Sequence, residues 1–283
     1  MTDFAKGIQM NTPTFSAEGI ELHPPEDFEG MRKAGQLAAE ILDMITDHVV
    51  PGVTTEKLDS LCHNHCTKAG AIPAPLNYQG GGPTPFPKSI CTSINHVVCH
   101  GIPNEKTLRE GDIINIDVTV ILDGWHGDTS RMYLVGDKIS VKARRLCDVT
   151  YDSMMAGIEA VKPGATLGDV GYAIQHVAES QRFSVVRDFC GHGLGRVFHA
   201  PPSVMHYGKP STGTILEPGM FFTIEPMINA GNYKTKVLKS DGWTAVTRDR
   251  SLSAQFEHSL AVTESGFEIF TLSPKGFTKP PYG

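Results

Sequence analysis

Residues 115–130 read NIDVTVILDGWHGDTS, and this stretch decides the fold and the chemistry that we expect of the chain. Apolar and polar residues alternate along 113–122, which is the pattern of a β-strand with two different faces. Asp123-Gly124 is one of the strongest two-residue turn signals, because a type I′ turn requires positive φ at both positions. The stretch therefore predicts a β-hairpin.

Two carboxylates occupy the hairpin where Val, Thr or Ile would be usual. The turn places Asp128 opposite Thr119, so that Asp117 and Asp128 are diagonal neighbours on one face, about 7–8 Å apart at Cα. Like charges at this distance repel each other unless a cation lies between them. Two solvated carboxylates on an exposed face are one interpretation. A metal site is the other, and it requires further ligands.

Three further stretches supply possible ligands. CGHGLG sets His192 between two glycines, where the backbone can approach a bound group, although a Gly-rich turn with an exposed His is an alternative. FFTIEPMI and SAQFEHSLAV place Glu225 and Glu257 in apolar strands, where a carboxylate without a partner would be costly. One His and four carboxylates are enough to hold two divalent ions. A set without thiolate favours manganese, iron or cobalt over a structural zinc site.

Composition narrows the class of protein. The chain has 283 residues, 40% apolar and 20% charged, with a net charge of −6, which predicts one large or two small domains. With this net charge the chain lacks the excess of basic residues that is typical of DNA-binding proteins. No apolar run approaches the length of a membrane span. The first residues lack the apolar core of a signal peptide, so we expect a cytoplasmic protein. Residues 1–22 are polar and aperiodic and are expected to form a tail or arm, with one catalytic domain over 23–283.

The six cysteines are scattered, without a C-x-x-C pair, which predicts reduced thiols. CHNHC at 62–66 contains four possible zinc ligands, but no companion pair lies nearby. On the helix expected over 55–69, Cys62 and Cys66 belong to an apolar stripe. Small buried thiols are therefore the better interpretation of this stretch.

Two parts of the chain repeat one pattern. VVPGVT (49–54) and VKPGAT (161–166) each join two segments of helical periodicity, which predicts two similar α+β halves. The helical segments are expected at 26–49, 55–69, 143–161 and 167–182. Strand-like runs with local hairpins predict an inner, mostly antiparallel sheet under these helices. The seam between the halves is a natural place for a site.

These stretches together resemble a known enzyme family. NIDVTV…GDTS, CGHGLGRVFH, TIEPM and SAQFEH, in this order and at this spacing, are similar to the methionine aminopeptidases of type I over residues 25–272. The resemblance implies the pita-bread fold, an α+β fold in which two pseudo-symmetric halves surround a curved antiparallel sheet covered by helices. It also implies removal of the initiator methionine from nascent proteins and peptides whose second residue is small.

The resemblance implies a role for each expected ligand. Asp117 would hold one of two divalent ions, and Asp128 and Glu257 would bridge both. His192 and Glu225 would complete the ligands of the other ion. The ions would be cobalt, manganese, iron(II) or zinc, and the pair would activate a water molecule. Glu225 is the candidate general base.

Further residues match positions that contact substrate or a cation in the family. His100 and His199 correspond to its two substrate-contacting histidines, which would stabilise the oxyanion and orient the scissile amide. The methionine pocket is expected to be lined by Tyr78, Phe86, Cys91, Phe198 and Trp243. A monovalent cation, sodium or potassium, is expected at Asn95, Val97 and Ser253.

Spacing indicates a bacterial-style or organellar type I enzyme. Too few residues separate His192 from Glu225 for the helical insertion of type II enzymes, and the segment before residue 25 lacks the zinc-binding cysteines of longer type I enzymes. One stretch departs from the family pattern. LNYQGGGPTPFPKSIC (76–91) carries an insertion of about five residues rich in Gly and Pro, and Pro75 stands where relatives often have Cys.

The implied partners are nascent polypeptide N-termini that begin with Met, with a transient association with the ribosome and a monomeric state. Neither DNA nor a membrane is expected as a partner. Two other classes remain open: a pita-bread protein that binds without catalysing, and a prolidase on the same fold. The complete ligand set disfavours the first, and the expected lack of a separate N-terminal domain disfavours the second.

Overall fold

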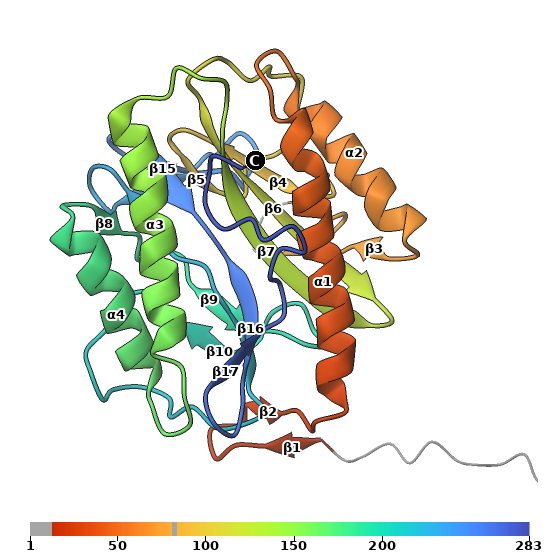
Figure 1. The fold of residues 1–283 in the computed structure, drawn as a ribbon, viewed down its shortest axis with the longest axis vertical. Coiled ribbons are helices and arrows are strands. Elements are labelled where there is room, and N and C mark those ends of the chain that lie inside the picture. The colour runs from red at the N-terminus through yellow and green to blue at the C-terminus, as the bar shows by residue number, and fades with distance from the viewer. Residues whose placement is uncertain (1–12, 81–83, 283) are drawn as a thin grey trace, which may run out of the picture.

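In a computed structural model of the chain, residues 13–80 and 84–282 are described, and in them helices cover a set of antiparallel sheets (Figure 1). The helices are α1 (Asp27–Ile45), α2 (Thr55–Lys68), α3 (Val141–Glu159) and α4 (Leu167–Ser180), with a 3-10 turn, η1 (Thr46–His48), after α1. All four predicted helices are confirmed. The first is shorter than predicted, because the chain tightens into η1 before it reaches Pro51.

The two Pro-Gly joints are alike in three dimensions. Gly52 and Gly164 adopt φ of +94° and +81°, conformations that a residue with a Cβ rarely takes. They lead into Thr54 and Thr166, whose hydroxyls cap α2 and α4 by accepting backbone N–H bonds. Each threonine also pairs with a later segment in an isolated antiparallel bridge. The predicted relation between the halves is therefore confirmed at the level of local structure.

The central strands lie between the two helix pairs, with α1 and α2 on one side and α3 and α4 on the other (Figure 1). In chain order they are β1 (Thr14–Phe15), β2 (Glu21–Leu22), β3 (Ile72–Pro73), β4 (Cys91–Ile94), β5 (Val97–Cys99), β6 (Ile113–Leu122), β7 (Trp125–Leu134), β8 (Ser184–Val185), β9 (Gly191–Gly193), β10 (Ala200–Val204), β11 (Phe221–Ile224), β12 (Met227–Asn229), β13 (Thr235–Val237), β14 (Ala245–Thr247), β15 (Ser253–Gln255), β16 (His258–Val262) and β17 (Phe267–Ile269). The sheet orders are β1-β2, β10-β9-β11-β16-β17, β15-β12-β8, β13-β14-β5 and β3-β6-β4, with β7 paired to β6.

The hairpin of β6 and β7 has the predicted register. Thr119 lies opposite Asp128, and Asp117 lies opposite Ser130. The turn residues Asp123-Gly124 have φ of 51° and 81°, as a type I′ turn requires. Because side chains alternate along a strand, this register places Asp117 and Asp128 on the same face of the hairpin.

The opposite face of β6 forms part of the core. Four of its side chains, each at most 2% exposed, belong to an apolar cluster with residues of α1 and α2: Ile114, Ile116, Val118 and Val120. Burying one such side chain contributes about 1.5–3 kcal/mol, so the face that carries the carboxylates is fixed by the burial of the other face. Cys62 and Cys66 of α2 pack in this cluster, which confirms them as buried thiols. A second cluster packs α3 and α4 against β11, β12 and β16.

Two predicted strands prove to be interrupted. FFTIEPMI divides into β11 and β12 around Glu225, and SAQFEHSLAV divides into β15 and β16 around Glu257. β11 pairs with β16 and β12 pairs with β15, in two different sheets, so both runs change sheet at the same place. The expectation that both glutamates lie within strands is therefore corrected. Pro226 has no N–H for a ladder, and the N–H of Glu225 donates to Nε2 of the buried His206 instead.

The expected tail falls partly outside the described residues, which begin at residue 13. Residues 14–22 form the small β1–β2 hairpin, in which Ile20 is buried, and His23 donates its N–H to the carbonyl of Gly219. The Gly/Pro-rich insertion also lies partly outside the described residues, at 81–83. Within the described ranges, no helix has both the length and the apolar character that a membrane crossing requires.

Candidate metal centre and substrate pocket

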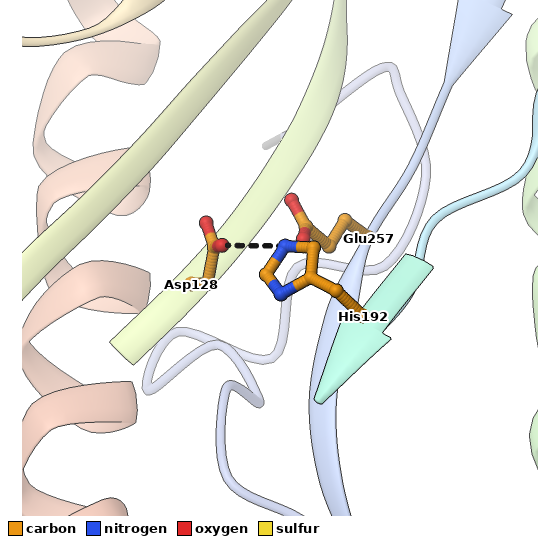
Figure 2. A group of neighbouring side chains, drawn as sticks. All are labelled: Asp128, His192 and Glu257. Carbon is orange, nitrogen blue, oxygen red and sulfur yellow. Dashed lines mark ion pairs between the residues drawn. The ribbon is translucent and has the colours of Figure 1, made fainter. Parts of the chain in front are cut away.

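Three of the expected ligands point toward one another in Figure 2: Asp128 from β7, His192 from β9 and Glu257 from the break between β15 and β16. One ligand atom of each lies within 4.8 Å of the others. Nε2 of His192 is 3.6 Å from Oδ2 of Asp128 and 3.6 Å from Oε1 of Glu225. These distances exceed a hydrogen bond, but they suit neighbouring ligands of one ion with bonds of about 2.0–2.2 Å.

Four carboxyl groups gather at this place, and among the described residues no lysine or arginine forms an ion pair with any of them. Burial raises the pKa of Asp117 well above its ordinary value, and the neighbouring Asp128 raises it further. Burial likewise raises the pKa of Asp128 to about 7. The pKa values of Glu225 and Glu257 are raised by burial first and then by Asp128. Buried carboxyl groups of this kind bind either protons or cations, and two divalent ions match the charge of four carboxylates.

His192 is presented as a neutral ligand. Its Nδ1 lies 3.1 Å from the carbonyl oxygen of Gly193, to which an N–H can donate, so Nε2 keeps its lone pair facing the carboxylates. Burial lowers the pKa of His192 to about 4, which keeps the ring uncharged at neutral pH. The flanking glycines allow this approach. A Cβ on Gly191 would lie 2.5 Å from the carbonyl oxygen of Thr223, and the strands would have to separate.

Several hydrogen bonds orient the carboxylates, and none of them was predicted from the sequence. The hydroxyl of Thr119 donates to Oδ1 of Asp128 at 2.7 Å. The hydroxyl of Thr223 donates to Oε1 of Glu225 at 2.8 Å, and Nε2 of Gln255 donates to Oε2 at 3.2 Å. The signal for Thr223 was available, since a residue two positions before Glu225 shares its face in an extended chain.

A cavity of about 400 Å³ opens over these groups. The five residues expected to form the methionine pocket all line it: Tyr78, Phe86, Cys91, Phe198 and Trp243. The ring of Phe86 meets that of Trp243 edge to face at 5.4 Å, and Tyr78 meets Phe198 in the same way at 5.0 Å. Further residues that line the cavity were not predicted from the sequence, among them Cys99, Asp188, Phe189, Ser203 and Met227. The cavity is therefore lined by aromatic and apolar side chains together with the carboxylates.

The two expected substrate-contacting histidines also line the cavity. Burial lowers the pKa of His100 to about 4, and burial together with His192 lowers the pKa of His199 to about 3. Both rings are therefore neutral at physiological pH, and each can donate a hydrogen bond without carrying charge. His100 lies edge to face with Phe189 at 5.5 Å, and the ring of His199 lies 4.2 Å from that of His192.

The three residues expected to hold a monovalent cation lie near one another. The N–H of Ser253 donates to the carbonyl of Asn95 at 2.8 Å, and Val97 begins the neighbouring strand β5. Oγ of Ser253 is buried and has no hydrogen-bond partner among the described residues, so its oxygen fits a cation ligand.

Comparisons with known proteins agree with this geometry. The model of metallopeptidase family M24 matches residues 29–264. The methionine aminopeptidase of Rickettsia prowazekii is 66% identical over 263 residues, which cover 93% of this chain and 99% of that protein. The methionine aminopeptidase of Escherichia coli K12 is 52% identical over 255 residues, covering 89% and 94%. A crystal structure of the Rickettsia prowazekii enzyme matches with a TM-score of 0.87 at 67% identity, covering 89% of this chain and 100% of that chain.

Proposed function

Since the chain belongs to metallopeptidase family M24, and within it to the bacterial-type methionine aminopeptidases, we propose that it removes the initiator methionine from nascent proteins and peptides whose second residue is small. The observation that carries the proposal is the aromatic cavity that is also lined by four buried or half-buried carboxylates and His192. An apolar, aromatic wall suits the flexible thioether side chain of methionine, whose sulfur makes favourable contacts with aromatic rings.

We propose that two divalent ions bind at the carboxylates. Asp117 would hold one ion, His192 and Glu225 would hold the other, and Asp128 and Glu257 would contribute to both. The oxygen and nitrogen donors suit manganese, iron(II), cobalt or zinc. When bound, such a pair supplies Lewis acidity and lowers the pKa of water, so that water is a nucleophile at neutral pH.

The protein's own groups have distinct tasks in this proposal. Glu225 accepts the proton of the attacking water, since burial raises the pKa of its carboxyl and suits it to act as a base. Thr223 and Gln255 hold its two oxygens in place. Neutral His100 and His199 donate hydrogen bonds to the substrate, and His199 does so to the carbonyl oxygen as negative charge develops there.

We further propose that the protein is a cytoplasmic monomer with a sodium or potassium ion bound at Asn95. We also propose that it associates with the ribosome. The segment around β13 and β14 supports it, because five cationic side chains are exposed there: Lys234, Lys236, Lys239, Arg248 and Arg250. Lys and Arg that meet RNA phosphates give an affinity that falls steeply with salt. Co-sedimentation with ribosomes should therefore weaken as salt rises, and salt-independent binding would contradict this part.

Purified protein tests the activity directly. Free methionine should be released from Met-Ala-Ser and hardly at all from Met-Lys-Ser, and no proline peptide of the Xaa-Pro type should be cleaved. Exhaustive chelation should abolish the release, and cobalt, manganese or iron(II) should restore it. Full activity after chelation would contradict the metal requirement. Equal kcat/KM for Ala and Lys at the second position would contradict the proposed preference, and cleavage of Xaa-Pro alone would favour a prolidase.

A further inference from the structure

A hydrogen bond joins the aromatic wall of the cavity to one of its histidines. Oη of Tyr78 lies 2.7 Å from Nδ1 of His199, and no other hydrogen bond to either side chain occurs among the described residues. The two ring centroids are 5.0 Å apart, and Phe198 packs against both rings. Tyr78 therefore fixes both the orientation of the His199 ring and the environment of one of its nitrogens.

Chemistry decides the direction of this hydrogen bond. A neutral imidazole has one N–H and one bare nitrogen, and the partner of one nitrogen sets which form is present. A phenol is a strong donor, and burial raises the pKa of Tyr78, so its proton is retained at neutral pH. The favoured arrangement is donation from the hydroxyl of Tyr78 to bare Nδ1. The proton of His199 then lies on Nε2.

We propose that Tyr78 is a positioning residue that holds His199 in the Nε2–H form, so that His199 donates a hydrogen bond to the substrate carbonyl. This inference rests on the proposed function for the role of His199. With the proton on Nδ1 instead, Nε2 would present a lone pair to the oxygen on which negative charge develops. That arrangement would repel the transition state instead of stabilising it.

The backbone around Tyr78 is suited to holding a fixed position. The N–H of Asn77 donates to the carbonyl of Phe86 at 2.8 Å, and the N–H of Phe86 donates to the carbonyl of Tyr78 at 3.0 Å. These two bonds close the base of the stretch in which the sequence departs from the family pattern. Phe86 is itself held against Trp243. The backbone of Tyr78 is therefore held by Phe86, and its hydroxyl by His199.

Tyr78→Phe removes the hydroxyl and keeps the ring, so it tests the hydrogen bond alone. With metal-loaded enzyme and Met-Ala-Ser, we expect kcat to fall by roughly 10–100-fold, as for other lost partners of functional histidines. KM should change less than about threefold, and bound metal should equal that of the wild type. Tyr172→Phe, an exposed tyrosine on α4, is the matched control and should leave all three values unchanged.

A double-mutant cycle separates positioning from packing. If Tyr78 acts through His199, Tyr78→Phe should have no further effect on kcat in the His199→Ala background. An undiminished loss in that background, or wild-type kcat in Tyr78→Phe alone, would overturn the inference. A wild type that releases no methionine at all would instead contradict the proposed function.

The ¹⁵N spectrum of histidine-labelled, zinc-loaded wild type reads the tautomer without any substitution, with His199→Asn used to assign the signals. The inference expects a protonated Nε2 and a bare Nδ1 for His199. A signal for protonated Nδ1 would overturn it, whatever the kinetics show. In Tyr78→Phe the two forms should become mixed.

Discussion

The two halves of the molecule bring ligands to the seam in different ways. The first half uses unbroken ten-residue strands, and Asp117 and Asp128 extend from the face of a regular hairpin. The second half uses short or interrupted strands, and Glu225 and Glu257 lie where the chain passes from one sheet to the next. A continuous ladder fixes a side chain through the backbone. Where the strands are interrupted, Glu225 is held by side-chain hydrogen bonds from Thr223 and Gln255, and Glu257 is held through its backbone by Ser130 and Thr129.

This difference has a structural reason. A paired strand residue already has its backbone groups satisfied, and its side chain projects at a set angle. At a break, the backbone finds other partners, as Glu225 does with His206, and Glu257 pairs once with Ser130 of the hairpin. The bridge between Glu257 and Ser130 joins the two halves directly at the carboxylates. The regular half therefore provides the frame onto which the irregular half is attached.

The largest expected effect comes from changing a shared ligand on the regular half. Asp128→Asn should lower kcat on the order of 10³-fold or more, since a neutral amide cannot bridge two cations and several kcal/mol of charge stabilisation would be lost. The fold should persist because the backbone pairing of β6 and β7 does not depend on this carboxylate. Steady-state kinetics and thermal unfolding of the purified variant measure both quantities.

Asp137→Asn is the matched control, because this exposed aspartate follows the same hairpin at the end of β7. It should keep wild-type kcat. Near wild-type turnover in Asp128→Asn would exclude the bridging role, and loss of folding would show that the hairpin depends on its ligands after all.

The next effect separates holding the ions from using them within the irregular half. His199→Ala should lower kcat by roughly 10²–10³-fold, as expected for a lost donor to the oxyanion, with bound metal near that of the wild type. His192→Ala should lose one ion, and with it most of the activity at low metal concentration. Metal analysis and kcat for both variants decide between the roles. If His199→Ala loses metal to the same extent as His192→Ala, the ligand set is wrong.

A smaller effect tests the contrast between the halves directly. Thr223→Val removes a hydroxyl that accepts from the N–H of His192 and donates to Glu225, so two ligands of the irregular half lose support. Metal affinity should weaken by roughly 10–100-fold. Thr119→Val removes only the bond to Asp128, whose position the ladder already sets, and should weaken affinity less. Manganese titration calorimetry on both variants gives the comparison, and equal losses would remove the distinction.

The same contrast explains what could be predicted from the sequence. The register of Asp117 and Asp128 followed from alternation and from one turn signal. Both signals are local, and side chains alternate between the two faces of a pleated strand. The helices followed from periodicity and from the Pro-Gly joints. The five candidate ligands followed from carboxylates in strand-like runs and a His between glycines, the family resemblance supplied their roles, and the structure places all of them on one cavity. The breaks at Glu225 and Glu257 could not be read, since both runs are apolar and their interruption depends on strands distant in the sequence.

The smallest expected effect is a pH dependence of stability that arises at the seam itself. In the metal-free protein burial raises the pKa of Asp128 to about 7 and raises that of Asp117 well above its ordinary value. The folded protein then holds protons that the unfolded chain has already released above about pH 4, where ordinary carboxyl groups ionise. The contribution of such groups to stability is fully present below their ordinary pKa. It is lost as pH rises through their pKa in the folded protein, because the folded state binds more protons than the unfolded chain does.

Chelated protein should therefore melt at a lower temperature at pH 7.5 than at pH 5. The melting temperature should fall by about 2–4 °C for each kcal/mol lost from the free energy of unfolding. Metal-loaded protein should not show this fall, since the ions replace the protons and bind more tightly as protons are released. Titrating groups elsewhere act equally in both forms, so the difference between the two melting curves isolates the seam. Asp128→Asn cannot ionise at this position and should flatten the curve of the chelated protein. Parallel melting curves for chelated and loaded protein would show that burial of these carboxylates does not destabilise the metal-free protein as pH rises. The argument for cations at the seam would then lose its physical basis.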